Sequence, residues 1–276
     1  MLDCKGSYLV KDGRLFPTNS VEFRTSDVIM IYEVVRIIDS VCLFASEHFS
    51  RLKRSAKLAG VQLTLTSADF ISSIRQLVDA NEQVNGNVKI LLQYGSGQQS
   101  VFFYFISHVY PEVKMYDSGV KSEFLLAERM MPQAKIVQQK FRDQATDFIK
   151  QHAIFDAILV NSDGRILEGS STNIFFVKDE TFVTPPSDFV LSGITREKVM
   201  ECLKELSFRC QEISIPYSEI ATYDAAFFTG TSPKVLPIAQ IGAQQFAPDY
   251  KPLKLLMKSY NEKIDKYIKK AKETGL

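Results

Sequence analysis

The sequence predicts an α+β protein built of two domains. Segments with a strand pattern and segments with a helical period both recur along the 276 residues, without a clean βαβ repeat. The length allows one to two domains, each with its own core. The pattern weakens between residues 111 and 132. We therefore predict a small N-terminal α+β domain over residues 1–120 and a larger C-terminal α+β domain over residues 121–276.

The first half contains the clearest elements. β-branched residues predict a strand over 28–37. Apolar residues recur at helical spacing over 41–59, and a second helix is expected from Ser67 to about Asn85. Two further strands are expected at 88–94 and 101–107, joined by a glycine-rich turn.

Helices and short strands also mix in the second half. Helical spacing predicts helices at 141–152, 195–206 and 253–270. Short apolar runs bounded by turn residues predict strands at 157–160, 174–177 and 225–229.

Composition and charge exclude several classes of protein. Lys and Arg total 33 against 32 for Asp and Glu, so no basic excess recruits nucleic acid. The four cysteines have no C-x-x-C spacing, which disfavours a disulfide framework or a zinc site and favours a reducing compartment. No signal pattern follows Met1, and apolar runs such as 101–106 are too short to span a bilayer. We expect a cytoplasmic enzyme without a metal.

Three polar segments in the second half are candidates for chemistry. Residues 167–176 place a carboxylate, Glu168, before a small polar loop, an Asn and an apolar strand; a simple β-turn has the same pattern. Residues 191–196 begin a helix. Its free N-terminal amides could form an anion-binding site, and ordinary helix capping explains the same pattern. Residues 228–238 place hydroxyl side chains around a glycine. This pattern is typical of a phosphate-binding loop and also of an ordinary turn.

In this order and spacing the segments resemble the class IV, D-amino-acid-aminotransferase-like family of pyridoxal-phosphate enzymes. That family includes branched-chain aminotransferases, D-amino acid aminotransferases and aminodeoxychorismate lyases. The resemblance runs from Tyr32 to Ile238, most of the chain. It implies the fold of a type IV pyridoxal-phosphate enzyme, with two α+β domains, pyridoxal 5'-phosphate between them, and usually a homodimer.

The resemblance also assigns cofactor roles. Glu168 matches the carboxylate that contacts the pyridine nitrogen, where a negative charge keeps the nitrogen protonated. The amides of Ile194 and Thr195, with the Thr231 hydroxyl, match the phosphate cup. Residues 47–55 resemble the helix pattern H-x-x-R-L-x-x-S, in which Arg51 would pair with the phosphate. Alone, Arg51 is more typical of a solvated helix surface.

The strand with Tyr32 and Glu33 matches the one whose aromatic residue faces the substrate pocket. A tyrosine of the core or of a hairpin would give the same pattern, so this role for Tyr32 depends on the resemblance alone.

Two lysines compete for the Schiff base with the cofactor. In the family the lysine precedes the carboxylate by a little over thirty positions. Lys135 precedes Glu168 by 33 residues and Lys140 by 28, so Lys135 is the predicted catalytic residue. Lys140 also stands where branched-chain aminotransferases have a tyrosine that bonds the phenolic oxygen. Arg129 is the candidate to replace that contact or to bind the substrate. Residues 93–110 lack the residues that usually bind the substrate carboxylate in this family.

The resemblance predicts transamination between an amino acid, of branched-chain or D-amino acid type, and a 2-keto acid. In that reaction Lys135 would first hold the cofactor and then move the substrate's α-proton. Two alternatives stay open. One is an aminodeoxychorismate lyase that releases pyruvate and 4-aminobenzoate with the same motifs. The other is a non-catalytic homologue, which the presence of both Lys135 and Glu168 disfavours.

Overall fold

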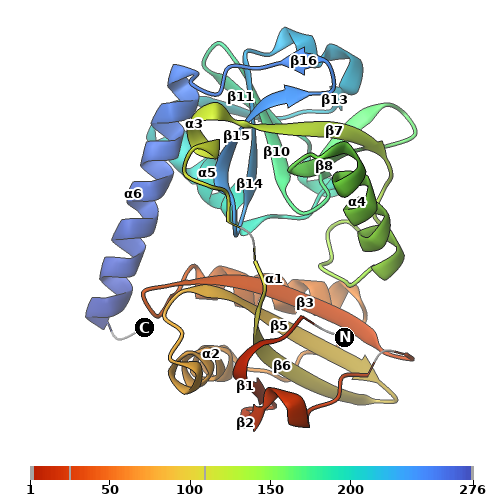
Figure 1. Ribbon diagram of the computed structural model, residues 1–276, viewed down its shortest axis with the longest axis vertical. Coiled ribbons are helices and arrows are strands. Elements are labelled where there is room, and N and C mark those ends of the chain that lie inside the picture. The colour runs from red at the N-terminus through yellow and green to blue at the C-terminus, as the bar shows by residue number, and fades with distance from the viewer. Residues whose placement is uncertain (1–2, 25, 109, 275–276) are drawn as a thin grey trace. The chain divides into compact units, whose positions relative to one another are not determined.

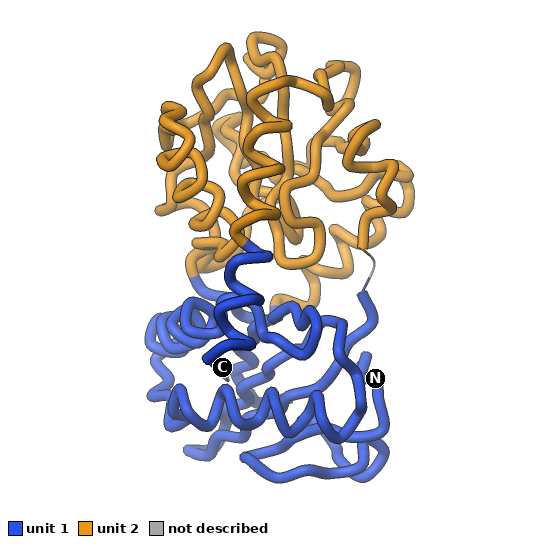
Figure 2. The backbone as a smooth tube through the Cα atoms, turned by 90° about the vertical axis from the view of Figure 1, so that its left-hand side faces the viewer, with its two compact units in different colours: residues 1–109, 134–137, 264–276 blue, residues 110–133, 138–263 orange. Residues whose placement is uncertain are grey.

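The computed structural model describes residues 3–24, 26–108 and 110–274 (Figure 1). The chain packs into two compact units, coloured separately in Figure 2. Unit 1 comprises Met1–Val109, Ala134–Val137 and Ile264–Leu276, and unit 2 comprises Tyr110–Gln133 and Gln138–Lys263. The predicted domains, 1–120 and 121–276, stay a prediction. The predicted α+β fold class is confirmed.

In the described part of unit 1, an antiparallel sheet packs with two complete helices and with the end of the last helix of the chain. The strands lie in the order β2-β1-β6-β5-β3-β4. They are β1 (Lys5–Lys11), β2 (Arg14–Pro17), β3 (Ile29–Ile38), β4 (Val41–Cys42), β5 (Gly86–Gly95) and β6 (Gln98–Ile106). The helices are α1 (Ala45–Leu58) and α2 (Ser67–Asn81), with a 3-10 turn at Thr18–Ser20.

The two faces of this sheet have different neighbours. Side chains alternate along a strand, so Ile31 and Val35 of β3 face α1 and α2, where they join the large buried cluster of unit 1. Tyr32 points to the opposite face, into a second cluster with Leu91 and Tyr104. Glu33 therefore belongs to the helix side and Tyr32 to the other side.

The segment 134–137 extends the sheet of unit 1. The short strand β4 leaves the first half of β3 with an open edge, and this segment pairs there through an antiparallel bridge between Ile31 and Ile136. The Tyr32 amide donates to the Lys135 carbonyl at 2.9 Å, and the Val137 amide donates to the Met30 carbonyl at 2.8 Å. The pairing fixes the backbone of Lys135 against β3.

Unit 2 is a larger mixed sheet with helices. In the described part of the chain the strand order is β12-β11-β10-β14-β15-β7-β8-β9-β13, with β16 paired to β15. The strands are β7 (Val120–Leu126), β8 (Asp156–Val160), β9 (Arg165–Gly169), β10 (Asn173–Lys178), β11 (Thr181–Thr184), β12 (Arg209–Glu212), β13 (Ile215–Pro216), β14 (Ala225–Gly230), β15 (Lys234–Ile241) and β16 (Gln244–Gln245). The helices are α3 (Met115–Ser118), α4 (Gln139–His152) and α5 (Ile194–Glu205), with 3-10 turns at Ser187–Phe189 and Tyr217–Thr222; α6 (Lys251–Thr274) is the last helix.

Most predicted elements are confirmed within a few residues, but the helix predicted over 41–59 begins only at Ala45. The reason is that Phe44 has a left-handed backbone with φ 52°. Val41, Leu43 and Phe44 are buried, and their spacing imitates a helical period.

Several strands fall where the sequence predicted no element. One of them is β7, in the stretch 111–132 where the sequence shows no clear strand or helix pattern. Buried and exposed positions do not alternate regularly along the whole of β7, so the period of a strand is hard to recognise there. Among the described residues, no helix has the length and apolar character to cross a membrane.

Candidate active site

A buried ion-pair cluster joins β3 to α1 in unit 1. Glu33 is completely buried, and the Arg51 fork donates to both its oxygens, from Nε to Oε1 at 2.7 Å and from Nη2 to Oε2 at 2.8 Å. His48 Nδ1 lies 2.8 Å from Glu33 Oε2. His48 and Arg51 are three residues apart and so share one face of α1. The predicted contact of Arg51 with a phosphate stays a prediction; the structure adds that Glu33 orients the guanidinium.

The cluster has a defined charge state. Burial opposes the ionisation of Glu33, but Arg51 and His48 outweigh it and lower the pKa of Glu33 to about 2. Burial lowers the pKa of His48; the positive charges of Arg51 and Lys135 act in the same direction, and together they outweigh the opposing effect of Glu33. Near neutral pH the cluster therefore contains an anionic Glu33, a cationic Arg51 and a neutral His48.

We expect stability to fall in acid in two stages. Unfolded His48 takes up a proton near pH 6.5 more readily than folded His48, so its contribution is complete above that pH and is lost below it. Glu33 has a pKa of about 2 when folded against 4.5 when unfolded, so its contribution, on the order of 3 kcal/mol, is lost between pH 4.5 and 2. Denaturant melts at successive pH values measure both stages.

His48→Gln provides the control for these melts. The variant should flatten the dependence between pH 7 and 5 and keep the decline below pH 4.5. An unchanged slope between pH 7 and 5 in the variant would show that another group titrates there.

The Lys135 side chain lies on the face of the unit 1 sheet opposite the helices, whereas its backbone is tied to α1. The Lys135 amide donates to Ser55 Oγ at 3.1 Å, and Ser55 is completely buried on α1. The Lys135 Nζ lies 4.8 Å from the centroid of the Tyr32 ring. Lys140, the competing lysine, is exposed in the first turn of α4. The backbone of Lys135 is thus fixed by hydrogen bonds, and its ammonium lies beside an aromatic ring.

A second ammonium group shares the Tyr32 ring. Lys89 Nζ lies 5.1 Å from the ring centroid, and Lys89 is only 8% exposed on β5. Sequence reasoning missed Lys89, although a single lysine inside the apolar run of residues 88–92 was a visible signal. Lysines are rarely buried unless their charge is paired or used. This face of unit 1 therefore combines two ammonium groups with an aromatic ring.

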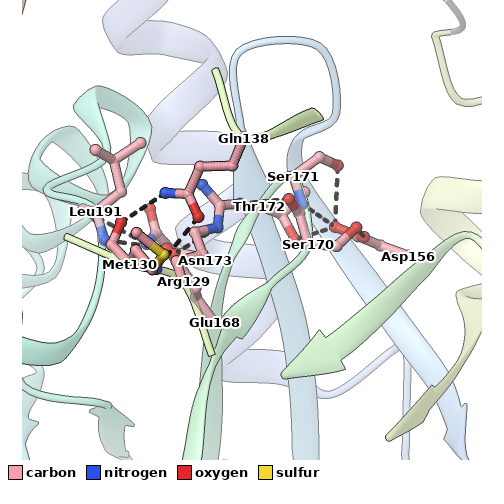
Figure 3. A network of polar contacts seen from close by, with 10 residues as sticks. All are labelled: Arg129, Met130, Gln138, Asp156, Glu168, Ser170, Ser171, Thr172, Asn173 and Leu191. Atoms are coloured by element: carbon pink, nitrogen blue, oxygen red, sulfur yellow. Dashed lines mark hydrogen bonds and ion pairs between the residues drawn. The ribbon is translucent and has the colours of Figure 1, made fainter. Parts of the chain in front are cut away.

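In unit 2 the Glu168 carboxylate is buried among donors (Figure 3). Its Oε2 accepts hydrogen bonds at 3.1 Å from Asn173 Nδ2 and from the Leu191 amide. Arg129 Nε lies 3.4 Å from Oε1. One cation and two hydrogen-bond donors thus surround this carboxylate. Glu168 lies within β9, and residues 170–172 form the turn that leads to β10.

Arg129 lies close to Glu168. Its guanidinium also donates to the Ser170 carbonyl and lies 5.2 Å from the centroid of the Phe141 ring. The predicted contacts of Arg129, with the phenolic oxygen of the cofactor or with the substrate, stay predictions.

The start of α5 offers donors to an anion. Its N-cap is Gly193, which has no side chain to bond the first amides, so the amides of Ile194 and Thr195 have no side-chain cap. A side chain at position 193 would collide with Asn173 Oδ1, which explains the glycine. Thr195 and Ile194 are buried, at 6% and 3% exposed. Amides at a helix start favour a phosphate.

A buried hydroxyl lies on β14, beside Asn173 of the neighbouring strand β10. Thr229 of β14 pairs directly with Asn173 of β10, so their side chains share one side of the sheet. Thr229 is 1% exposed, and its Oγ1 has no hydrogen-bond partner among the described residues. A buried hydroxyl of this kind indicates a group that accepts its proton. Thr231, the predicted phosphate ligand, follows two residues later and is half-buried.

The cysteines do not offer an alternative nucleophile. All four are free thiols, and burial raises the pKa of Cys4 and Cys210 to about 11 and that of Cys42 to about 12. Burial also raises the pKa of Cys202. Thiols of this kind stay protonated near neutral pH and attack poorly.

Comparison with known proteins decides the family. The sequence model of the amino-transferase class IV family matches residues 30–241, about three quarters of the chain. The chain belongs to the class IV aminotransferase family. The D-alanine aminotransferase of Bacillus licheniformis is 27% identical over 227 residues, which cover 78% of this chain and 79% of that relative.

Two solved structures of the family's fold are also similar. A branched-chain aminotransferase from the archaeon Thermoproteus uzoniensis, solved with norvaline, has a TM-score of 0.83 at 24% identity and covers 94% of both chains. A putative 4-amino-4-deoxychorismate lyase from Legionella pneumophila has a TM-score of 0.78 at 21% identity, covering 84% of this chain and 90% of that one. These likenesses confirm the predicted type IV fold.

The class IV aminotransferases use pyridoxal phosphate, and the residues present fit that group. Another branched-chain aminotransferase of the same fold was solved with pyridoxamine 5'-phosphate. The uncapped amides at the start of α5 and the buried Thr229 hydroxyl are donors suited to the phosphate. The buried Glu168 carboxylate suits a protonated ring nitrogen. The side chain of Lys135 is a primary amine, the group with which an aldehyde reacts.

Proposed function

We propose that this protein is a pyridoxal-phosphate-dependent aminotransferase that moves an amino group between an amino acid and a 2-keto acid. The observation that carries the proposal is that Lys135 and Glu168 are both present and both held. Hydrogen bonds fix the Lys135 backbone to Tyr32 and Ser55, and donors surround the Glu168 carboxylate. We further propose a homodimer in the cytoplasm.

Each proposed residue has one task. Pyridoxal phosphate, when bound, supplies an aldehyde for amines and a ring that accepts the electrons of the substrate's Cα–H bond. Lys135 would hold the cofactor through its side-chain amine and would move the substrate's α-proton as general base and acid. The Glu168 carboxylate would accept a hydrogen bond from the protonated ring nitrogen.

The proposed ligands of the phosphate are the amides of Ile194 and Thr195, with the hydroxyls of Thr229 and Thr231. Arg51, whose guanidinium is oriented by Glu33, would add a charge-assisted contact. Because His48 is neutral, Arg51 supplies the positive charge of this cluster on α1.

Tyr32 and Lys89 are the proposed substrate contacts of unit 1. The Tyr32 ring offers an apolar surface, as a branched-chain or D-amino acid substrate needs. The Lys89 ammonium, at 5.1 Å from that ring, suits a carboxylate of the amino acid or keto acid.

The main alternative is a lyase that releases pyruvate from aminodeoxychorismate. It requires the same lysine, and the lyase-like protein from Legionella pneumophila shares the fold. The two reactions differ in one requirement: a transaminase needs a 2-keto acid as acceptor, whereas the lyase does not.

An assay with purified protein and added pyridoxal phosphate tests the proposal. We expect amino transfer from L-branched-chain or D-amino acids to 2-oxoglutarate, and no transfer when the keto acid is omitted. In Lys89→Met we expect the KM for the acid substrates to rise roughly tenfold, with a smaller change in kcat, because a charged contact is lost. Pyruvate release from aminodeoxychorismate without a keto acid would establish the lyase instead. No reaction with either set would favour a non-catalytic homologue.

A further inference from the structure

A second carboxylate in unit 2 has donors on every side. Asp156, the first residue of β8, is completely buried. Its Oδ1 accepts from Ser170 Oγ at 2.5 Å and from the Ala157 amide at 2.9 Å. Its Oδ2 accepts from the Ser171 amide at 3.1 Å, Ser171 Oγ at 3.0 Å and Thr172 Oγ1 at 2.8 Å. Most of these donors come from residues 170–172, the turn between β9 and β10.

These contacts explain the composition of the turn. Its serine and threonine hydroxyls all point to Asp156 (Figure 3), so they are bound within the protein. Gly169 lacks a side chain because a Cβ would collide with Thr172 Oγ1 and lie 2.7 Å from Asp156 Oδ2. The small polar loop is therefore built around a buried carboxylate.

The turn connects two residues of the candidate active site. Glu168 precedes it and Asn173 follows it, and Asn173 Nδ2 donates to Glu168 Oε2 at 3.1 Å. Arg129 holds the turn from another direction through the Ser170 carbonyl, while its Nε lies 3.4 Å from Glu168. The position of the turn thus decides how Asn173 and Arg129 meet the Glu168 carboxylate.

We propose that Asp156 is a positioning residue for Glu168. It acts through residues 169–173 and does not itself contact the cofactor. This inference rests on the proposed function, in which Glu168 keeps the ring nitrogen protonated. The Ala157 and Ser171 amides can only donate, so the acceptor must offer oxygen on both sides, which a carboxylate does and an amide does not.

Asp156→Asn tests the inference, because it keeps the volume and removes one acceptor. The readout is the absorbance of protein-bound pyridoxal phosphate as a function of pH, which reports on the charge around the cofactor independently of turnover. We expect its midpoint to move in the same direction as in Glu168→Gln. We also expect kcat to fall roughly ten- to hundredfold, because a small misplacement of a catalytic group is costly, with KM less affected.

Thr184→Val provides the matched control. Thr184 is 1% exposed, and its hydroxyl donates to the Ile174 carbonyl at 2.8 Å and not to Asp156 or Glu168. Its loss should lower the Tm and leave the absorbance profile unchanged. An Asp156→Asn protein with a lowered Tm and a wild-type profile would overturn the proposal and leave Asp156 a structural residue only.

Two further outcomes separate the inference from the proposed function. If Glu168→Gln itself leaves the profile unchanged, the assignment of Glu168 fails, and the inference fails with it. If Glu168→Gln shifts the profile and Asp156→Asn does not, only the inference fails. Should Asp156→Asn not fold, Thr172→Val removes a single donor to the carboxylate and should shift the midpoint less, in the same direction; no shift there would count against the inference.

Discussion

Lys135→Ala should abolish amino transfer, with a fall in kcat of at least roughly 10³-fold. Two functions disappear together: the amine that holds the cofactor and the base that moves the α-proton. The local structure supports this choice of lysine. Lys135 has its backbone fixed by Ser55 and by Tyr32, and its Nζ lies 4.8 Å from the Tyr32 ring centroid.

Lys140→Ala is the matched control for this prediction. Lys140 is exposed in the first turn of α4, so its removal should change the rate less than about threefold. Steady-state rates with the best amino acid and keto acid pair measure both variants. Full activity in Lys135→Ala, or loss of activity in Lys140→Ala alone, would show that Lys135 is not the catalytic lysine.

Glu168→Gln should lower kcat by roughly 10²-fold and weaken cofactor binding much less. A fall in kcat of this size is typical when an enzyme loses one preorganised electrostatic partner of the reacting group. A neutral amide cannot keep the ring nitrogen protonated, so the ring accepts electrons poorly. The proposed phosphate donors at the start of α5 are separate groups, so this substitution should leave them in place.

The measurement for Glu168→Gln is kcat together with the Kd of pyridoxal phosphate from a fluorescence titration. Glu123→Gln is the control, because this half-buried carboxylate of β7 accepts from the neighbouring Phe124 amide and does not contact Arg129 or Asn173 in the described contacts. Glu123→Gln should match the wild type in both quantities. A Glu168→Gln protein with wild-type kcat would remove Glu168 from the ring nitrogen.

Sequence reasoning found the residues whose spacing carries the resemblance. The distance of 33 residues from Lys135 to Glu168 separates two lysines that local patterns cannot distinguish. The pattern H-x-x-R-L-x-x-S in residues 47–55 marked both Arg51 and Ser55. Their contacts were not visible, because the partners Glu33 and Lys135 come from other segments.

The rest depends on contacts between residues that are distant in the sequence. Asp156 lies 14 residues before Ser170 and shares no recognisable motif with it, so no local pattern indicates that the hydroxyls of the turn bind this carboxylate. The segment 134–137 pairs with β3 at a separation of about a hundred residues, and a local pattern does not show such pairing. Lys89 is visible in the sequence as a single lysine inside an apolar run, but its place beside the Tyr32 ring is not, because Tyr32 belongs to another strand.

The most direct test of the account is the site of covalent attachment. The purified protein is loaded with pyridoxal phosphate, reduced with borohydride, digested, and analysed by peptide mass. The account predicts the added mass of the reduced cofactor on Lys135, its loss in Lys135→Ala and its persistence in Lys140→Ala. The added mass on Lys140, or none on any lysine, would contradict it.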